Sequence, residues 1–127
     1  MSRVSNIRIR TRSGEWDAFL DDSDISNEIW LKLPFTADIN MLASQIYFEM
    51  VTDNKVKGDS KIFDKGDIAY WPSANALCIF FGPTPLSGDD ERPVTSYQMK
   101  KIGAVKGDCS LMERSGDRMR ITLERSF

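Results

Sequence analysis

Histidine is absent from this chain of 127 residues. Without imidazole, a protein has no Ser-His or Cys-His nucleophile pair, no histidine general base and no ordinary catalytic zinc site. Any chemistry would have to use carboxylates, arginine, lysine, tyrosine or amides. The composition therefore excludes most familiar hydrolase mechanisms, and we assign no catalytic residue, no metal site and no cofactor from it.

Cysteine and long apolar runs are also scarce. Cys78 lies within the apolar run ALCIFF and Cys109 follows a Gly-Asp pair, so the two lack the spacing of a disulfide framework. No apolar run approaches the ~20 residues that span a bilayer. The opening MSRVSNIRIRTR lacks the apolar core of a signal peptide. We predict reduced, structural thiols, a cytoplasmic location and no membrane partner.

An excess of one charge is missing too, because 17 lysines and arginines face 19 aspartates and glutamates, for a net charge of −2. Such a chain has no global field to attract nucleic acid, so nucleic acid is not an expected partner. Arginines alternate with Ile7 and Ile9 along residues 4–11. This pattern is typical of a solvated strand face or of a phosphate-binding stripe, and we favour the solvated face.

The length of the chain suits one compact domain over residues 1–127, which can bury roughly two thirds of its unfolded surface. A helix is predicted over Ile25 to Leu33, because Ile25, Ile29 and Leu33 fall on one face and Ser23 can cap its start. Pro34 ends it, since the residue before a proline avoids the helical region. The oligomeric state stays open.

The segment of residues 66–85, GDIAYWPSANALCIFFGPTP, carries the strongest fold signal. Ile68 to Trp71 are strand formers entered from a turn, whereas Ala76 to Phe81 show no polar alternation and must be covered on both faces. Alternating strands at either end of the chain complete the pattern. We predict a mainly β fold, a closed β-barrel of about eight strands with one short helix over a barrel end.

Residues 53–64 imitate a calcium loop in length, with an acid at each end and Gly58 at the sixth position. Lys55 and Lys57 occupy the third and fifth positions, where the ion needs oxygen ligands. We therefore predict no calcium site here.

Several pieces of the sequence, in order, resemble the small prokaryotic cyclophilin-like family. They are the hairpin around Ser13-Gly14, the helix ending at Leu33-Pro34, IYFEM at residues 46–50, GDIAYW followed by ALCIFFGPTP, and IGAVKGD at residues 102–108. The resemblance implies a closed barrel of about eight strands with a helix against an open end. Its members have no agreed activity, so the resemblance supplies a fold and not a reaction.

Two departures from related sequences bear on function. Members of this family usually carry a Trp-Gly-acid sequence before the tyrosine strand, whereas this chain has Leu42-Ala43-Ser44-Gln45, which leaves Gln45 a hydrogen-bonding role. The motif that carries the arginine and glutamine of true prolyl isomerases is not found. Peptidyl-prolyl isomerisation nevertheless stays an alternative. The reaction breaks no bond, and a hydrophobic pocket with one donor can lower its barrier of ~18–20 kcal/mol.

The candidate ligand site consists of residues on the predicted inner wall and in the loop after it: Gln45, Tyr47, Trp71, Phe81, Thr84 and Arg92. Plain packing is the competing interpretation, because side chains just fill the interior of an eight-stranded barrel. Glutamine and tyrosine on an apolar wall need partners, however, and a few polar groups in an aromatic cleft are typical of ligand sites. We predict a binding module for a peptide segment or small organic ligand, with Arg92 gripping a carboxylate.

Overall fold

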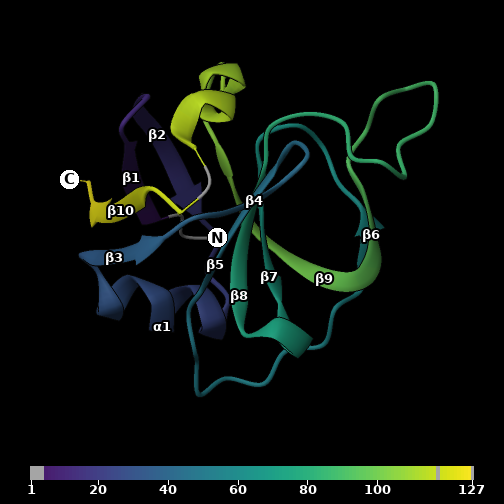
Figure 1. The fold of residues 1–127 in the computed structure, drawn as a ribbon. Helices are drawn as coiled ribbons and strands as arrows, with labels where there is room; N and C mark the ends of the chain where they lie inside the picture. Colours follow the sequence, from purple (N-terminus) through teal and green to yellow (C-terminus); the bar gives the residue numbers. More distant parts are fainter. Residues whose placement is uncertain (1–4, 117, 127) are drawn as a thin grey trace.

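The computed structural model describes residues 5–116 and 118–126. Within them the chain forms one α-helix, α1 (Asp24–Lys32), and two 3-10 helices, η1 (Pro72–Ala74) and η2 (Ser110–Ser115). The strands are β1 (Ser5–Thr11), β2 (Gly14–Leu20), β3 (Phe35–Asp38), β4 (Asn40–Leu42), β5 (Gln45–Glu49), β6 (Ser60–Ile62), β7 (Asp67–Trp71), β8 (Ala76–Phe80), β9 (Val94–Val105) and β10 (Arg120–Arg125). Figure 1 shows the strands curling around a common centre, with α1 at one end.

All described strand pairs are antiparallel and belong to a ten-stranded sheet in the order β3-β10-β1-β2-β9-β7-β8-β5-β4, with β6 paired to β9 beside this path. The predicted closed barrel of about eight strands is therefore wrong. The path is open, because among the described residues β3 pairs only with β10 and β4 pairs only with β5.

The two ends of this open path are adjacent in the chain, joined at Ile39. The Ile39 N–H donates to the Met119 carbonyl on the β10 side, after which the chain turns to β5. Residues 35–42 thus form one extended stretch whose first half pairs with β10 and whose second half pairs with β5. This change of partner interrupts the hydrogen-bond ladder where a barrel would close. The predicted number of strands was too low because β4 and β6 have three residues each, too few to show an alternating pattern in the sequence.

Helix α1 confirms the predicted element to within a residue at each end. The Ser26 N–H donates to the side chain of Ser23, and the helix ends at Lys32, with Leu33, the residue before Pro34, as its C-cap. Ile25, Ile29 and Leu33 are buried against the sheet. Among the described residues, no helix has the length and apolar character to cross a bilayer.

The arginines of β1 lie on an exposed face of the sheet. Arg8 pairs with Asp17 opposite it on β2, and Arg10 contacts both Glu15 opposite it on β2 and Glu124, which lies diagonally from it on β10. The stripe is therefore a set of cross-strand ion pairs, each half exposed and each worth little in stability.

Strand β8 is covered on both faces, which confirms the expectation for Ala76 to Phe81. Alternate side chains point into two clusters. The inner core is enclosed by the curled sheet and α1, and its buried members include Ile7, Ile9, Leu20, Ile25, Ile29, Ile46, Phe48, Tyr70, Leu77, Ile79, Phe81, Ile102 and Ile121. The outer cluster lies on the opposite face of β5, β7 and β8 and consists of Phe63, Ala69, Cys78, Phe80 and Met99. Both cysteines are buried free thiols, as predicted.

Candidate functional site

A cleft of about 260 Å³ opens next to the outer cluster. Strands β4, β5, β7 and β9 and the loop of residues 82–93 supply its walls. The lining residues are Leu42, Gln45, Trp71, Thr84, Pro85, Leu86, Val94, Thr95, Ser96, Tyr97 and Met99. Most are apolar, so the cleft offers mainly carbon surface with a few polar groups, as ligand sites do.

An irregularity in β9 shapes one wall of the cleft. Between the two residue pairs that join β6 to β9, Ser60 with Met99 and Ile62 with Val94, β6 has one residue and β9 has the four residues 95–98. This is a large bulge, and bulges re-aim side chains and often adjoin functional sites. Here the bulge brings Tyr97 against Trp71.

Three aromatic rings meet beside the cleft. Tyr97 stacks on Trp71 with ring centroids 5.2 Å apart, and Tyr47 meets Trp71 edge-on at 5.8 Å. The indole N–H of Trp71 donates to the Ser73 hydroxyl at 2.8 Å. With its polar edge engaged, the ring presents apolar surface to the cleft.

Like Thr95, Gln45 is a buried polar residue of the cleft, with 4% of its surface exposed. Its amide hydrogen-bonds the thiol of Cys78 on the neighbouring strand β8. Burial raises the pKa of Cys78 to about 12 against the opposing effect of that hydrogen bond, so the thiol is neutral near pH 7. Gln45 thus carries an oriented amide at the edge of an otherwise apolar wall.

Thr84 and Ser87 shape the loop that overhangs the cleft. The Thr84 hydroxyl accepts from the Val94 N–H at 3.1 Å and donates to the Val94 carbonyl, which ties the two ends of the loop together. The Ser87 hydroxyl accepts from the Thr84 N–H and donates to the Arg92 carbonyl. Pro85 and Leu86 are left to line the cleft with apolar surface.

The structure brings together three of the six residues predicted for the site. Gln45, Trp71 and Thr84 line the cleft, although the Thr84 hydroxyl is committed to its own loop. Tyr47 lies behind Trp71. These side chains are on the outer face of the sheet, because residues two apart on a strand share a face and Ile46 and Phe48 occupy the inner one.

The remaining two lie elsewhere. Phe81 is buried in the inner core, where it follows Leu77 and Ile79 in the alternation. The Arg92 guanidinium pairs with Asp64 at 3.0 Å and does not line the cleft.

Sequence reasoning missed Leu42, Leu86 and Tyr97. Leu86 and Tyr97 belong to the polar run of residues 86–98, which predicts a surface excursion, and Leu42 belongs to residues 35–50, which predict an extended segment. The one available signal was the isolated aromatic ring of Tyr97 in the polar run VTSYQ, because a lone large aromatic there indicates a packing partner.

A second cavity, of about 300 Å³, lies below η1 and is lined by Thr52, Asn54, Lys55, Val56, Tyr70, Pro72 and Asn75. The segment of residues 51–59 that covers it is held by Glu28 of α1. The Glu28 carboxylate accepts from the Asp53 N–H at 2.7 Å and from the Asn54 N–H and side-chain amide at 2.9 and 2.6 Å. Burial by itself raises the pKa of Glu28, but these hydrogen bonds and Lys32 outweigh it and lower the pKa.

Over residues 5–116 and 118–126, no three histidine, cysteine or acidic side chains are grouped so that they could hold a metal ion. The segment of residues 53–64 belongs to this described part. Two of its three acids are engaged with protein groups, since Asp59 pairs with Lys100 and Asp64 with Arg92.

Comparison with known proteins identifies the fold family. The sequence profile of the cyclophilin-like family matches residues 5–124. The chain belongs to the cyclophilin-like family. It is also similar to the solution structure of a hypothetical protein from Archaeoglobus fulgidus, with 29% sequence identity, a TM-score of 0.71, and 96% of this chain and 95% of that chain covered. A comparison with curated protein sequences finds no match. Membership of the cyclophilin-like family thus establishes the fold, whereas a function has to be inferred from the cleft.

Proposed function

We propose that this cyclophilin-like protein is a binding module that takes a peptide segment or small organic ligand in the cleft beside Trp71. The observation that carries the proposal is the Trp71–Tyr97 stack at the edge of the apolar cleft. Stacked rings on a half-open surface supply large, rigid contact area at a low cost in conformational entropy, as they do in binding sites generally.

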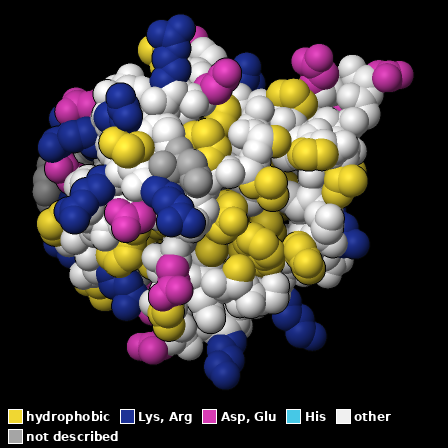
Figure 2. All heavy atoms as spheres, in the orientation of Figure 1, with side chains coloured by type: hydrophobic (Ala, Val, Ile, Leu, Met, Phe, Trp, Pro, Cys, Tyr) yellow, Lys and Arg dark blue, Asp and Glu magenta, His cyan; other side chains and the backbone are white. Residues whose placement is uncertain are grey.

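Exposed apolar side chains at the rim support the proposal. Leu42, Leu86 and Tyr97 all line the cleft, and each is more than half exposed. Grouped exposed apolar side chains mark sites for ligands or partners, whereas single ones need no explanation. In Figure 2 hydrophobic side chains gather over the half of the molecule that carries β4 to β9.

The polar groups of the cleft suit orientation of a ligand more than chemistry. Gln45 offers an amide, and Ser96 lines the same cleft. The predicted grip of Arg92 on a carboxylate is not part of the proposal, because Arg92 pairs with Asp64. Prolyl isomerisation, the alternative, needs a hydrogen-bond donor near the imide nitrogen. Arg92 was the only arginine among the predicted site residues, so with Arg92 outside the cleft no observation favours isomerisation over binding. The predicted cytoplasmic location stays a prediction, which the two free thiols support.

The test is a thermal-shift screen of short peptides and small apolar molecules, followed by titration of each hit through intrinsic tryptophan fluorescence. A ligand that binds the folded state raises the melting temperature. Leu86→Ser should weaken every hit by about tenfold, the loss of one buried leucine contact of roughly 1.5 kcal/mol. Leu31→Ser is the matched control, because Leu31 is 75% exposed on α1, outside the cleft.

Trp71→Ala gives an independent check by thermal shift, since it removes the ring that carries the proposal. Hits that keep their affinity in both Leu86→Ser and Trp71→Ala would place the binding surface elsewhere. A screen without any hit would remove the proposed function.

A further inference from the structure

The size of the cleft indicates what kind of ligand it can take. At about 260 Å³ it is smaller than the ~300–1,000 Å³ of sites that enclose drug-sized molecules. Its rim is apolar and open, with Leu42, Leu86 and Tyr97 exposed by 56%, 54% and 56%. A longer chain lying across the rim and inserting one apolar side chain would cover both the cleft and these rim residues.

One stretch of β9 beside the cleft lies between the residues that pair with β6. Thr95, Ser96 and Tyr97 belong to β9, yet none has a paired residue on a neighbouring described strand. The Tyr97 carbonyl accepts from the Thr95 hydroxyl at 2.6 Å, a local substitute for a strand partner. An extended peptide commonly binds by adding main-chain hydrogen bonds to such an unpaired stretch, with a pocket for an alternate side chain.

Charge beside the cleft has one sign. The loop that supplies Pro85 and Leu86 continues into Asp89, Asp90 and Glu91, all exposed. Over residues 5–116 and 118–126, none of these three carboxylates forms an ion pair, while Arg92 is neutralised by Asp64. Figure 2 shows acidic side chains at the tip of this projecting loop.

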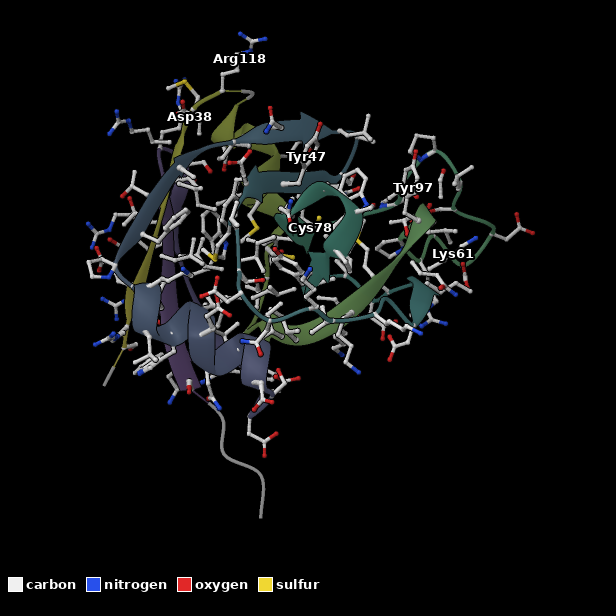
Figure 3. All side chains as sticks on the ribbon, turned by 90° about the horizontal axis from the view of Figure 1, so that it is seen from below. Asp38, Tyr47, Lys61, Cys78, Tyr97 and Arg118 are labelled. Atoms are coloured by element: carbon white, nitrogen blue, oxygen red, sulfur yellow. The ribbon has the colours of Figure 1, made fainter. Side chains whose placement is uncertain are left out.

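Cations near the cleft do not cancel this charge. Figure 3 shows Lys61 at the same end of the molecule as Tyr97, and over residues 5–116 and 118–126 no ion pair joins Lys61 to Asp89, Asp90 or Glu91. Lys100 and Lys101, on β9, are paired with Asp59 and Asp67. The local field therefore attracts a positively charged partner, although the whole chain has a net charge of only −2.

We propose that the ligand is an extended peptide segment that inserts one apolar side chain beside Trp71 and Gln45 and places lysine or arginine residues against Asp89, Asp90 and Glu91. This inference rests on the proposed function and names its ligand class. The peptide main chain runs along residues 95–97 of β9. Apolar burial supplies affinity, and the acidic loop supplies selectivity and a faster encounter.

Three fluorescent nonapeptides with blocked ends test the proposal by anisotropy titration. The basic probe is Gly-Lys-Lys-Gly-Leu-Gly-Lys-Lys-Gly, the acidic probe replaces each lysine by glutamate, and the third replaces the leucine of the basic probe by alanine. The basic probe should bind at least about tenfold more tightly than either of the others at low salt, and the advantage over the acidic probe should shrink to about threefold or less near 1 M salt, where the screening length falls to ~3 Å.

The charge is then removed from the protein. The triple variant Asp89→Asn, Asp90→Asn, Glu91→Gln keeps the hydrogen bond from the Arg92 N–H to the side chain of residue 90, because asparagine retains that oxygen. It should lose most of the preference for the basic over the acidic probe. The matched control is Asp22→Asn, Asp38→Asn, Glu113→Gln, which removes three exposed carboxylates from other elements. It should keep the preference.

The outcomes separate this inference from the proposed function. Equal loss of preference in both triple variants would show that net charge and not the loop selects the peptide, which overturns the inference. Small apolar molecules that bind in a Leu86-dependent way, with no binding of any peptide, would also overturn it and leave the proposed function intact. If neither peptides nor small molecules bind, both fall.

Discussion

The two faces of strand β8 differ in how they are covered. Leu77 and Ile79 point into the inner core, where the curled sheet and α1 enclose them. Cys78 and Phe80 point into the outer cluster, which has few buried members and is covered by the short strand β6 and the bulged start of β9. Regular strands and a helix enclose the inner face, whereas the outer face borders an open cleft. Because short and irregular segments cover the outer face, part of its surface stays exposed and can contact a ligand.

The prediction with the largest expected effect compares the loss of stability caused by one substitution on each face of the sheet. Phe48→Ala, in the inner core, should lower the free energy of unfolding by about 3–5 kcal/mol, because an enclosed cavity cannot collapse. Phe80→Ala, in the outer cluster, should cost only about 2–3 kcal/mol, because the irregular cover can settle into the space. Both phenylalanines are fully buried, so exposure does not separate them.

Urea unfolding measures both values under the same conditions. Equal losses would contradict the distinction between a rigid and an adaptable face. Phe80 also stacks on Phe63 at 4.8 Å between ring centroids, so Phe80→Ala should in addition weaken ligand binding, which Phe48→Ala should leave nearly unchanged in the folded protein.

A smaller effect should follow from disturbing only the cover of the outer face. A Cβ atom at Gly58 would lie 2.3 Å from the carbonyl group of Gln98, in the bulge of β9. Gly58→Ala therefore forces the bulge to shift, at a cost of about 1–3 kcal/mol, as overpacking usually does. Because Tyr97 lies in the same bulge, ligand affinity should fall with it.

Gly88→Ala is the control for this substitution, since a Cβ atom at Gly88 meets nothing within 4 Å. It should change the free energy of unfolding by less than about 0.5 kcal/mol. Thermal unfolding and ligand titration of both variants make the comparison. Unaltered affinity in Gly58→Ala would show that the bulge does not form the site.

The smallest predicted effect concerns Glu28, which ties the segment of residues 51–59 to α1 with a side chain only 15% exposed. Its pKa is lowered below the usual 4.5 in the folded state, so the stability it contributes is present above pH 4.5 and is lost as the pH falls through the folded value. Glu28→Gln, which removes the charge, should cost about 1–2 kcal/mol at pH 7.

The cost of Glu28→Gln should be smaller at acidic pH, below the lowered folded pKa of Glu28, where the wild-type carboxyl group is protonated as well. Unfolding measured at both pH values, with hydrogen exchange of residues 51–59, tests this. Glu113→Gln is the control, because Glu113 is exposed in η2. A cost that stays the same at both pH values would mean that the carboxylate charge is irrelevant to this contact.

Regular elements were predictable because their patterns reflect burial directly. The 3.6-residue spacing of Ile25, Ile29 and Leu33 identified the helix, and the unbroken apolar run of Ala76 to Phe81 identified a strand covered on both faces. Barrel closure was not predictable. It depends on which neighbour each half of residues 35–42 pairs with, and hydrogen-bond partners leave no trace in the local pattern.

The candidate site divides in the same way. Gln45 and Trp71 were found because alternation places them on one face of regular strands. Tyr97 was missed because a four-residue bulge has no period, and Leu86 because the path of a loop depends on hydrogen bonds such as those of Thr84. The position of Arg92 depends on Asp64, 28 residues away in sequence. Loop contacts of this kind are tertiary facts that a single sequence does not carry.

The break at Ile39 has a consequence for association between molecules. An open sheet exposes edge strands, and a long unpaired edge is a template on which another chain can add. Here the sheet path ends in β3 and β4, of four and three residues, placed end to end in one stretch that is bonded on opposite sides. Each of these two edges offers far fewer backbone groups than a long edge strand would, which limits aggregation through the open ends of the sheet path.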